Sequence, residues 1–546
     1  METKVVFRRS RRVMRGQFED RKVLARTMAE MREDVVRSLQ LNRDLARLVE
    51  RALQLDQGMK VGWSRNGEPN PKQGEMGVAP GLPEGARLRM LGALNDSVAA
   101  FSTGGNFTLE GTAGELFGAW NNGGNLSVER GVGAFLGHGM CDGRITVRDG
   151  AGDDAGSQMS GGLLLVRGDA GLRIGGGMSG GTIVVHGDVG REPGVGMTGG
   201  QIIINGRCPA IPEGVKMDSL STAAAKKLNS EIGDSTLEVP NDAVCLTAIE
   251  DSAIRPTAPE SVPSGGWGGI GLVNGGEDAV PVHSQRDTLV LLAERGGESK
   301  AVGLPLPLIP MRESGKGLKG EMTSIQPFIV RKEPRSIDLV ILDSNNLNDC
   351  FALLEKAGGA VLDLAALPTL SSPVLDGIVV SLRGILDEDS PIIFIDDVDR
   401  VERLHRSATG CGIDAVIARL GDSSGRSADS ALPLVGRSAA SSGMATDGIL
   451  SGLNIDWNAD AADLAISCAA GSTILSCQVP DDSSQAIEAW LRELHEGLCG
   501  WLVHLGISTI DNLTRKHLRA LDHETASTSG LRLSGYGRPL PHWFAS

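Results

Sequence analysis

Two adjacent carboxylates, Asp396 and Asp397, directly follow the apolar run 391–395, which has the composition of a buried strand. Paired carboxylates at a strand end could serve as an acid and a base. The alternative is a helix N-terminus, where acidic side chains interact favourably with the helix dipole. We favour the helix N-terminus, which gives these two residues no chemical role.

Cysteine and histidine chemistry is weakly indicated. The eight cysteines stand singly with no C-x-x-C pair, which argues against a zinc ribbon, a common ferredoxin cluster and a disulfide framework. The nine histidines form no H-E-x-x-H motif, and no G-x-S-x-G elbow occurs. Cys208 could be reactive, although a capping position is the favoured interpretation. We expect surface or packing roles for His504, His517 and His542.

Charge and hydropathy narrow the class of partner. The net charge of −15 disfavours nucleic acid as the main partner. An arginine cluster at residues 8–15 is the exception, and we interpret it as a solvated helix start, with an anionic partner as the alternative. No run of 18 apolar residues exists, so no membrane span is expected. Single cysteines and the absence of a signal peptide predict a cytoplasmic protein.

A strict repeat governs residues 86–206. Glycines recur at steps of 19, as in the series Gly105, Gly124, Gly143, Gly162, Gly181 and Gly200. Methionines keep the same step at Met140, Met159, Met178 and Met197. A fixed period of about 20 residues indicates a solenoid in which each unit adds one strand to a parallel sheet. We expect the methionines to form an interior ladder; a metal-binding stripe is the alternative.

The rest of the chain divides around this repeat. Residues 1–85 are expected to form an N-terminal helical segment (20–54) followed by a loop, and 209–265 to form a linker with short elements. Residues 266–546 are expected to form one domain. From about residue 335 strands alternate with helices, which indicates parallel βα units in an open sheet or a (β/α) barrel. Strands are predicted at 338–342, 360–364, 377–382, 391–395 and 414–418, and helices at 348–356, 398–408, 486–505 and 507–521. A complete barrel needs further strands from 270–334.

The repeat unit, a strand followed by G-x-x-G-x-x-x-G-x-x-M-x-G-G, resembles the GXGXG domain that closes the large subunit of glutamate synthase. The segment 177–190 (GMSGGTIVVHGDVG) is equally similar to the glycine-repeat subunit of formylmethanofuran dehydrogenase. Both resemblances imply a right-handed single-stranded β-helix over 86–208. They imply nothing specific about activity.

A second resemblance concerns the C-terminal half. The tail 506–522 (GISTIDNLTRKHLRALD) and the βα unit 391–420 resemble the archaeal-type FMN-binding synthase domain of glutamate synthase. This resemblance implies glutamate formation from glutamine and 2-oxoglutarate, with FMN in the barrel. The family's flavin loop is matched loosely at Gly421, Ser424 and Gly425. Partner chains would supply the glutaminase and the electrons.

Departures from that family leave the function open. The clustered iron–sulfur cysteines are missing, so no [3Fe–4S] cluster is expected, and Asp396 and Asp397 stand where the family has a lysine. One hypothesis is a glutamate-synthase-like oxidoreductase subunit with FMN. The other, slightly favoured, is a non-catalytic scaffold or regulator of an amidotransferase complex. A structural subunit of a formylmethanofuran-dehydrogenase-type complex is a third.

Overall fold

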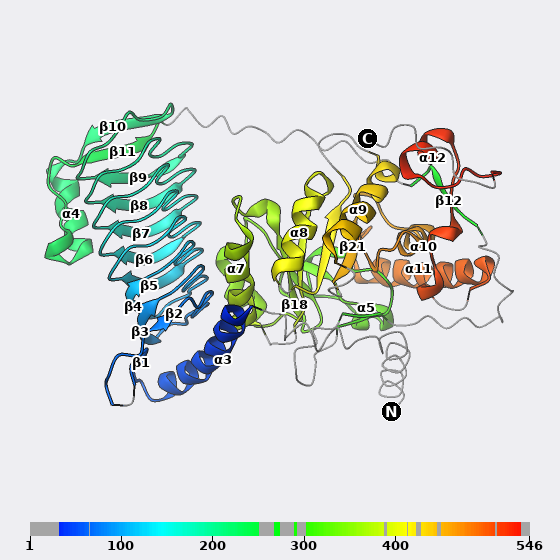
Figure 1. The fold of residues 1–546 in the computed structure, drawn as a ribbon, viewed down its shortest axis with the longest axis horizontal. Coiled ribbons are helices and arrows are strands. Elements are labelled where there is room, and N and C mark those ends of the chain that lie inside the picture. The colour runs from blue at the N-terminus through cyan, green and yellow to red at the C-terminus, as the bar shows by residue number, and fades with distance from the viewer. Residues whose placement is uncertain are drawn as a thin grey trace.

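The computed structural model describes residues 32–64, 66–249, 267–273, 289–291, 302–386, 390–411, 413–421, 427–444, 449–507 and 510–536. Two bodies lie side by side (Figure 1). The first, here called the coil stack, spans residues 59–248, and the second, the barrel domain, spans 302–533. None of the helices within these ranges is long and apolar enough to cross a membrane.

The coil stack is built on a parallel sheet whose strands follow one another in chain order. Leu88 pairs with Phe107, Phe107 with Leu126 and Leu126 with Ile145, so each strand lies one 19-residue unit after its neighbour. A second ladder of single bridges joins Ala113, Val132, Ala151, Ala170 and Val189. The 19-residue step in the sequence therefore equals the offset between paired residues in neighbouring strands. Its strands are β3 (Arg87–Ala93), β4 (Asn106–Thr112), β5 (Asn122–Val128), β6 (Asp142–Val147), β7 (Ser160–Val166), β8 (Ser179–Val185) and β9 (Gly199–Ile204).

Inward-facing aliphatic side chains fill the coils. The repeating methionines are at most 3% exposed and lie in one core cluster with Ile145, Val147 and the aliphatic residues above and below them. The predicted interior ladder is confirmed. Dispersion contacts between identical residues in successive coils hold such a stack together.

Helix α3 (Glu33–Gln54) closes the N-terminal end of the coil stack. The buried Asn42 donates from Nδ2 to the Gly77 carbonyl (2.7 Å) and accepts from the Ala79 amide (3.1 Å). Ser38 Oγ accepts from the Met76 amide at 3.0 Å. Solenoid ends expose unpaired backbone groups, and α3 satisfies them with side chains.

The N-terminal helix was expected at 20–54, and its part before residue 32 lies outside the described residues. The expected loop at 55–85 contains two short strands, β1 (Met59–Val61) and β2 (Lys72–Gln73). Both pair in parallel with β3, so the sheet begins before the repeat becomes visible in the sequence.

Replacing Asn42 by alanine is expected to lower the free energy of unfolding by about 2–3 kcal/mol, because a buried carbonyl and a buried amide lose their partners. Urea denaturation would measure the change. Gln40→Ala is the matched control: Gln40 lies on the same helix, is exposed, and bonds to Asp44 in that helix. An equal effect from both substitutions would contradict the capping role.

The C-terminal end of the coil stack is closed differently. Strand β11 (Val244–Ala248) pairs antiparallel with β9, and β10 (Val215–Ser219) pairs antiparallel with β11. Helix α4 (Thr222–Ile232) covers the outer face of the sheet, where Leu228 and Ile232 share a cluster with Leu165 and Ile203. Residues 209–249, expected to be part of a linker, thus extend and cover the stack. Neither strand follows the 19-residue repeat, so neither stands out in the sequence as part of the stack.

The barrel domain contains an eight-stranded parallel sheet in chain order. The last strand returns to the first: Leu475 bridges to Leu308, Gln478 bridges to Met311, and the Met311 amide donates to the Cys477 carbonyl at 2.7 Å. The α/β barrel expectation is confirmed at this level, and residues 305–332 supply the missing strands. The strands are β15 (Met311–Ser314), β16 (Ile329–Lys332), β17 (Leu339–Leu342), β18 (Gly359–Asp363), β19 (Ile392–Asp397), β20 (Ala415–Arg419), β21 (Leu450–Asn454) and β22 (Ile474–Ser476).

Helices surround the barrel, and two sequence predictions fail among them. The run 377–382 was predicted to be a strand but lies inside α7. Every residue from Val374 to Arg383 is buried, and a fully buried apolar run carries no period that separates strand from helix. The helices of the domain up to residue 505 are α5 (Glu321–Ile325), α6 (Cys350–Leu354), α7 (Ser372–Ile385), α8 (Val401–Cys411), α9 (Ala428–Ser442), α10 (Ala461–Ala469) and α11 (Ser484–Leu505).

The second failure is the helix predicted at 507–521. This segment forms two single 3-10 turns (Ile510–Asn512 and Arg515–His517) and the strand β23 (Leu518–Ala520), followed by α12 (His523–Ser529). Strand β23 pairs antiparallel with β12 (Ile270–Leu272), a tertiary contact that overrides local helix propensity. In a separate two-stranded sheet, β13 (Leu289–Leu291) pairs antiparallel with β14 (Val302–Leu304).

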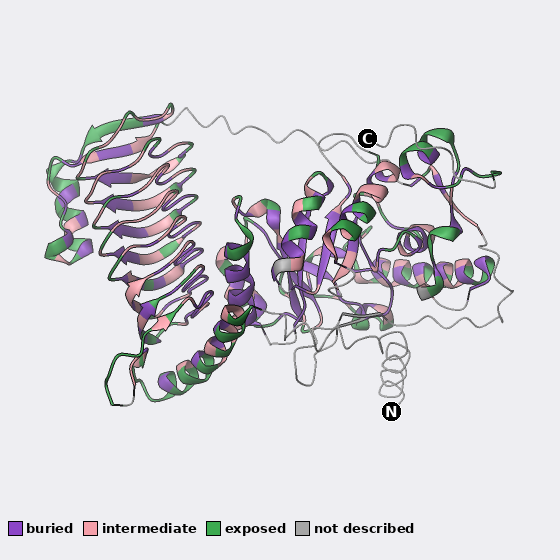
Figure 2. Cartoon of the chain, viewed as in Figure 1, coloured by how far each residue is buried: buried purple, intermediate pink, exposed green. Residues whose placement is uncertain are grey.

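The coil stack and the barrel domain are packed directly against each other. Ser381 Oγ on α7 donates to the Ser97 carbonyl at 3.2 Å, and Asn122 Nδ2 donates to the Asn348 carbonyl at 3.3 Å. A methyl group on Gly77 would lie 2.5 Å from the Gly377 carbonyl oxygen, so the two backbones touch. Figure 2 shows α7 as largely buried between α3 and the barrel. The two bodies therefore share one continuous packed interface.

Candidate site at the mouth of the barrel

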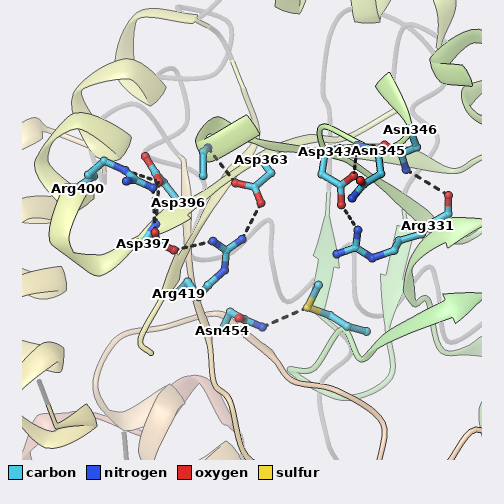
Figure 3. A network of polar contacts seen from close by, with 12 residues as sticks. Arg331, Asp343, Asn345, Asn346, Asp363, Asp396, Asp397, Arg400, Arg419 and Asn454 are labelled. Carbon is cyan, nitrogen blue, oxygen red and sulfur yellow. Dashed lines mark hydrogen bonds and ion pairs between the residues drawn. The ribbon is translucent and has the colours of Figure 1, made fainter. Parts of the chain in front are cut away.

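The carboxyl ends of the barrel strands carry a ring of polar, mostly charged side chains (Figure 3). Alternate residues of each strand point inward, so the apolar interior residues Ile329, Ile341 and Ile417 are followed two positions later by polar ones. Active sites of barrel enzymes occupy this face. The ring consists of Arg331, Asp343, Asp363, Asp397, Arg419 and Asn454.

Arg419 is the centre of the larger network. Its Nη2 lies 2.8 Å from Asp363 Oδ2 and its Nη1 lies 2.6 Å from Asp397 Oδ1. Arg400 extends the network, with Nη2 at 2.9 Å from Asp397 Oδ2 and Nε at 2.8 Å from the buried Asp396 Oδ1. Burial would lower the pKa of Arg419, but the facing carboxylates outweigh it and raise the pKa. The guanidinium stays charged and is the counter-ion that Asp363 and Asp397 share.

Asp396 and Asp397 therefore serve as ion-pair partners. They precede the 3-10 turn Val398–Arg400 and α8, as the helix N-terminus interpretation required, yet neither side chain caps that turn. Both carboxylates are committed to arginines. This arrangement gives the pair a structural role and does not point to acid–base chemistry.

A smaller network lies across the mouth. Arg331 forms an ion pair with Asp343, and its Nε is 3.9 Å from Glu313 Oε2. Asp343 Oδ1 also accepts from the Asn345 amide at 2.9 Å. Each cation of the ring thus faces carboxylates from neighbouring strands.

Replacing Arg419 by methionine is expected to destabilise the protein by about 1–2 kcal/mol, because two facing carboxylates lose their shared counter-ion. The side chain is 29% exposed, so solvent screening keeps the loss below that of a fully buried pair. Thermal unfolding would measure it. Adding Asp363→Asn and Asp397→Asn should restore stability. Arg437→Met, at an exposed arginine on α9, is the control and should have almost no effect.

The site residues expected from the flavin loop fall at the edge of this mouth. Gly421 lies two residues after the end of β20, whereas Ser424 and Gly425 lie outside the described residues. A methyl group on Gly421 would sit 3.2 Å from Asp456 Oδ2. The Asp456 carboxylate therefore lies beside Gly421, the one residue of these three that the structure describes.

The described residues do not fit a flavin phosphate. In barrels, phosphate is held by the loops after the seventh and eighth strands and by a helix N-terminus. Here the seventh loop ends in Asp460 and Asp463, which occupy the N-terminus of α10 as a reciprocal capping box, with bonds of 2.9 and 3.0 Å. The eighth loop carries Asp481 and Asp482. These carboxylates would repel an anion, so the described loops do not form a site for a flavin phosphate.

The remaining candidates for chemistry are not part of the ring. Burial raises the pKa of the half-buried Cys208 thiol, which disfavours a nucleophile there. Cys477 is buried, with its pKa raised to about 12. His517 is buried and accepts from the Thr514 amide at 3.1 Å, His504 is exposed, and His542 lies outside the described residues.

Metal chemistry gains no support from the described ranges, which contain no cluster of three or more His, Cys, Asp or Glu side chains able to hold a metal ion. Whether the protein carries an iron–sulfur cluster stays a prediction from the sequence.

Apart from Asp397, the residues of the ring were not predicted from the sequence to be site residues. A signal was present: Asp363 and Arg419 each close an apolar run that was correctly predicted as a strand. Charged residues at the carboxyl ends of parallel strands meet at one face of the barrel.

Comparison with known proteins adds little. No family model matches the chain, and no curated protein matches it. Among solved structures, the flavin-binding domain of baker's yeast flavocytochrome b2 is 12% identical, with 47% of this chain and 76% of that chain covered and a TM-score of 0.33. A mandelate oxidase variant is 11% identical, with 46% and 87% covered and a TM-score of 0.31. Scores this low carry no argument, so the barrel rests on its own strand pairing.

Proposed function

We propose that this chain is a structural subunit of a glutamate-synthase-like oxidoreductase complex. In this proposal the coil stack is a right-handed single-stranded β-helix of the GXGXG type, and the barrel domain is a relative of the FMN-binding synthase domain that no longer holds flavin. The observation that carries the proposal is Arg419, which bridges Asp363 and Asp397 across the mouth where a barrel enzyme would bind its cofactor.

The charge balance of the mouth supports this proposal. Every carboxylate of the larger network has an arginine partner within 2.9 Å, so a ligand would have to break ion pairs before it could bind there. The loops that would meet a phosphate are acidic. A scaffold needs a packed junction between the two bodies, to which the hydrogen bonds of Ser381 and Asn122 contribute.

The proposal extends to location and partners. All eight cysteines lie in the described part of the chain and none is in a disulfide, which is consistent with a reducing cytoplasm. Glutaminase and electron-input chains would be the partners in a glutamate-synthase-like complex. The same scaffold could serve another amidotransferase complex or one of the formylmethanofuran-dehydrogenase type.

One observation favours a second candidate, a catalytic FMN-dependent glutamate-forming barrel. The sheet is parallel and eight-stranded, and it closes through Leu475 and Gln478, the architecture such an enzyme requires. Catalysis would need FMN to displace or recruit the arginines of the mouth.

The absorption spectrum of the purified, unheated protein separates the two candidates. A structural subunit is expected to be colourless and to remain so after incubation with FMN and gel filtration. Stoichiometric flavin bands would overturn the structural proposal in favour of the catalytic one. A double variant, Asp456→Asn with Asp460→Asn, removes two carboxylates from the side of the mouth where a phosphate would bind. If charge repulsion excludes FMN, this variant should bind more FMN than the unaltered protein does.

A further inference from the structure

Strand β10 (Val215–Ser219) is the last strand of the coil-stack sheet. It pairs with β11 on one side, and no strand within the described residues pairs with its other edge. Residues 216–219 are all exposed. An open strand edge carries unpaired N–H and C=O groups, to which a further strand can add.

The ladder between β10 and β11 determines which backbone groups of β10 face the open edge. Gly214 and Leu220, on either side of the strand, form hydrogen bonds toward the β11 side at 3.0 and 2.8 Å. Hydrogen-bonded pairs alternate along an antiparallel ladder, so the even-numbered residues bond to β11. The odd-numbered residues Val215, Met217 and Ser219 therefore direct their N–H and C=O groups to the open edge.

A second copy of this chain matches that edge in charge. In an antiparallel pairing centred on Met217, Lys216 of one copy lies opposite Asp218 of the other, and this contact occurs twice. Both side chains are on one face of β10, with Lys216 Nζ 2.7 Å from Asp218 Oδ2, and both are more than half exposed. They occupy the non-hydrogen-bonded positions, where side chains of facing strands are closest. The exchange of the internal ion pair for two pairs between copies therefore costs little.

The two faces of β10 also permit this pairing. Met217 lies opposite Leu246, on the face where Val215 joins the core of the coils, yet it is 42% exposed. A second Met217 would cover it. On the other face, α4 begins after β10 and runs away from the open edge toward β6, where Arg144 Nη2 donates to the Ile232 carbonyl at 2.7 Å (Figure 1). Helix α4 therefore leaves the edge free.

We propose that β10 pairs antiparallel with β10 of a second copy, centred on Met217, and joins two coil stacks into one continuous sheet across a two-fold axis. The barrel domain contacts residues 77, 97 and 122, near the other end of the stack. The two barrel domains therefore lie at the far ends of the dimer. A contact of one short strand is small, so the dissociation constant is expected to be on the order of 10 μM. This pairing involves only the coil stack and does not depend on whether the chain binds FMN.

Sedimentation velocity of the full chain between about 1 and 100 μM, a range that brackets this constant, measures the dimer. Lys216→Glu and Asp218→Lys should each abolish it, because like charges then face each other at two places. An equimolar mixture of these two variants should dimerise again, since acid faces base at both places. A chain that stays monomeric throughout the range overturns the proposal and leaves the edge to a strand of another protein. So does a mixture that stays monomeric while the unaltered protein dimerises.

Two further variants locate the contact. Met217→Pro removes an N–H that faces the open edge without breaking a bond to β11, and it should abolish the dimer. Lys226→Glu makes the same charge change as Lys216→Glu at an exposed position on α4 and should leave the dimer unchanged. Circular dichroism confirms that each variant is folded. Undiminished dimerisation of a folded Met217→Pro variant would place the contact elsewhere and refute the proposal.

Discussion

Replacing Gly111 by alanine is expected to lower the free energy of unfolding by about 4 kcal/mol, at the upper end of what single substitutions cause. An added methyl group would lie 1.6 Å from the Gly92 carbonyl oxygen and 2.7 Å from its carbon. Gly92 and Gly111 are paired neighbours in β3 and β4, so the obstacle is backbone that cannot rotate away. The coils must separate locally, which breaks the ladder and opens the core.

Gly131→Ala is the matched control for Gly111. Gly131 lies in the same coil stack, its φ is outside the left-handed region, and its nearest obstacle is the Gly150 oxygen at 3.5 Å, an ordinary contact. Alanine there is expected to change stability by less than about 0.5 kcal/mol, since it also restricts the unfolded chain. Urea denaturation of both variants measures the difference. If both variants lose equal stability, glycine is needed in the coil stack for its backbone flexibility and not because neighbouring strands lie too close for a side chain.

Acidification from pH 7.5 to pH 4 is expected to remove about 3 kcal/mol of stability through each of two buried histidines. Burial lowers the pKa of His138 and of His405 to about 4, from 6.5 in the unfolded chain. Their Nδ1 atoms each lie 2.8 Å from a serine hydroxyl, on Ser157 and Ser438. The unfolded state binds protons below pH 6.5 while the folded state resists until about pH 4, so stability falls across this window.

Variants isolate the histidine contribution from other titrating groups. Asp429 has the opposite effect. Burial raises its pKa to about 6, so the folded state binds a proton at a higher pH than the unfolded state does, and this favours folding as the pH falls. His138→Gln and His405→Gln should each reduce the acid-induced loss by about 3 kcal/mol. His504→Gln, at an exposed position, should leave the pH profile unchanged. Unfolding free energies at several pH values, compared between variants, provide the measurement; parallel profiles would contradict the assignment.

The coil stack was the part most open to prediction. Its period is set by backbone stacking, and a period survives in the sequence as regularly spaced glycines and methionines. The ends of the stack were not visible, because β1, β2, β10 and β11 pair through tertiary contacts and follow no repeat. A cap needs only the correct shape and a few hydrogen bonds, as Asn42 illustrates.

The barrel was only partly predictable. Strands with β-branched runs, such as 391–395 and 414–418, were found, whereas 377–382 was assigned to the wrong element because burial on all sides erases periodicity. The network around Arg419 depends on residues from three strands meeting at one face. Such a meeting follows from the order of strands in the barrel, which a local pattern does not contain.

The position of α3 has a consequence for synthesis on the ribosome. The cap of the coil stack is translated before the coils that it terminates, so each new coil can add to a finished end. Its second contact, the 2.9 Å ion pair between Arg32 and Asp376 on α7, involves a residue 344 positions later. At about 5–20 residues per second, α3 waits roughly half a minute for that partner. The coil stack and its cap are therefore synthesised in full before the barrel domain that contacts them.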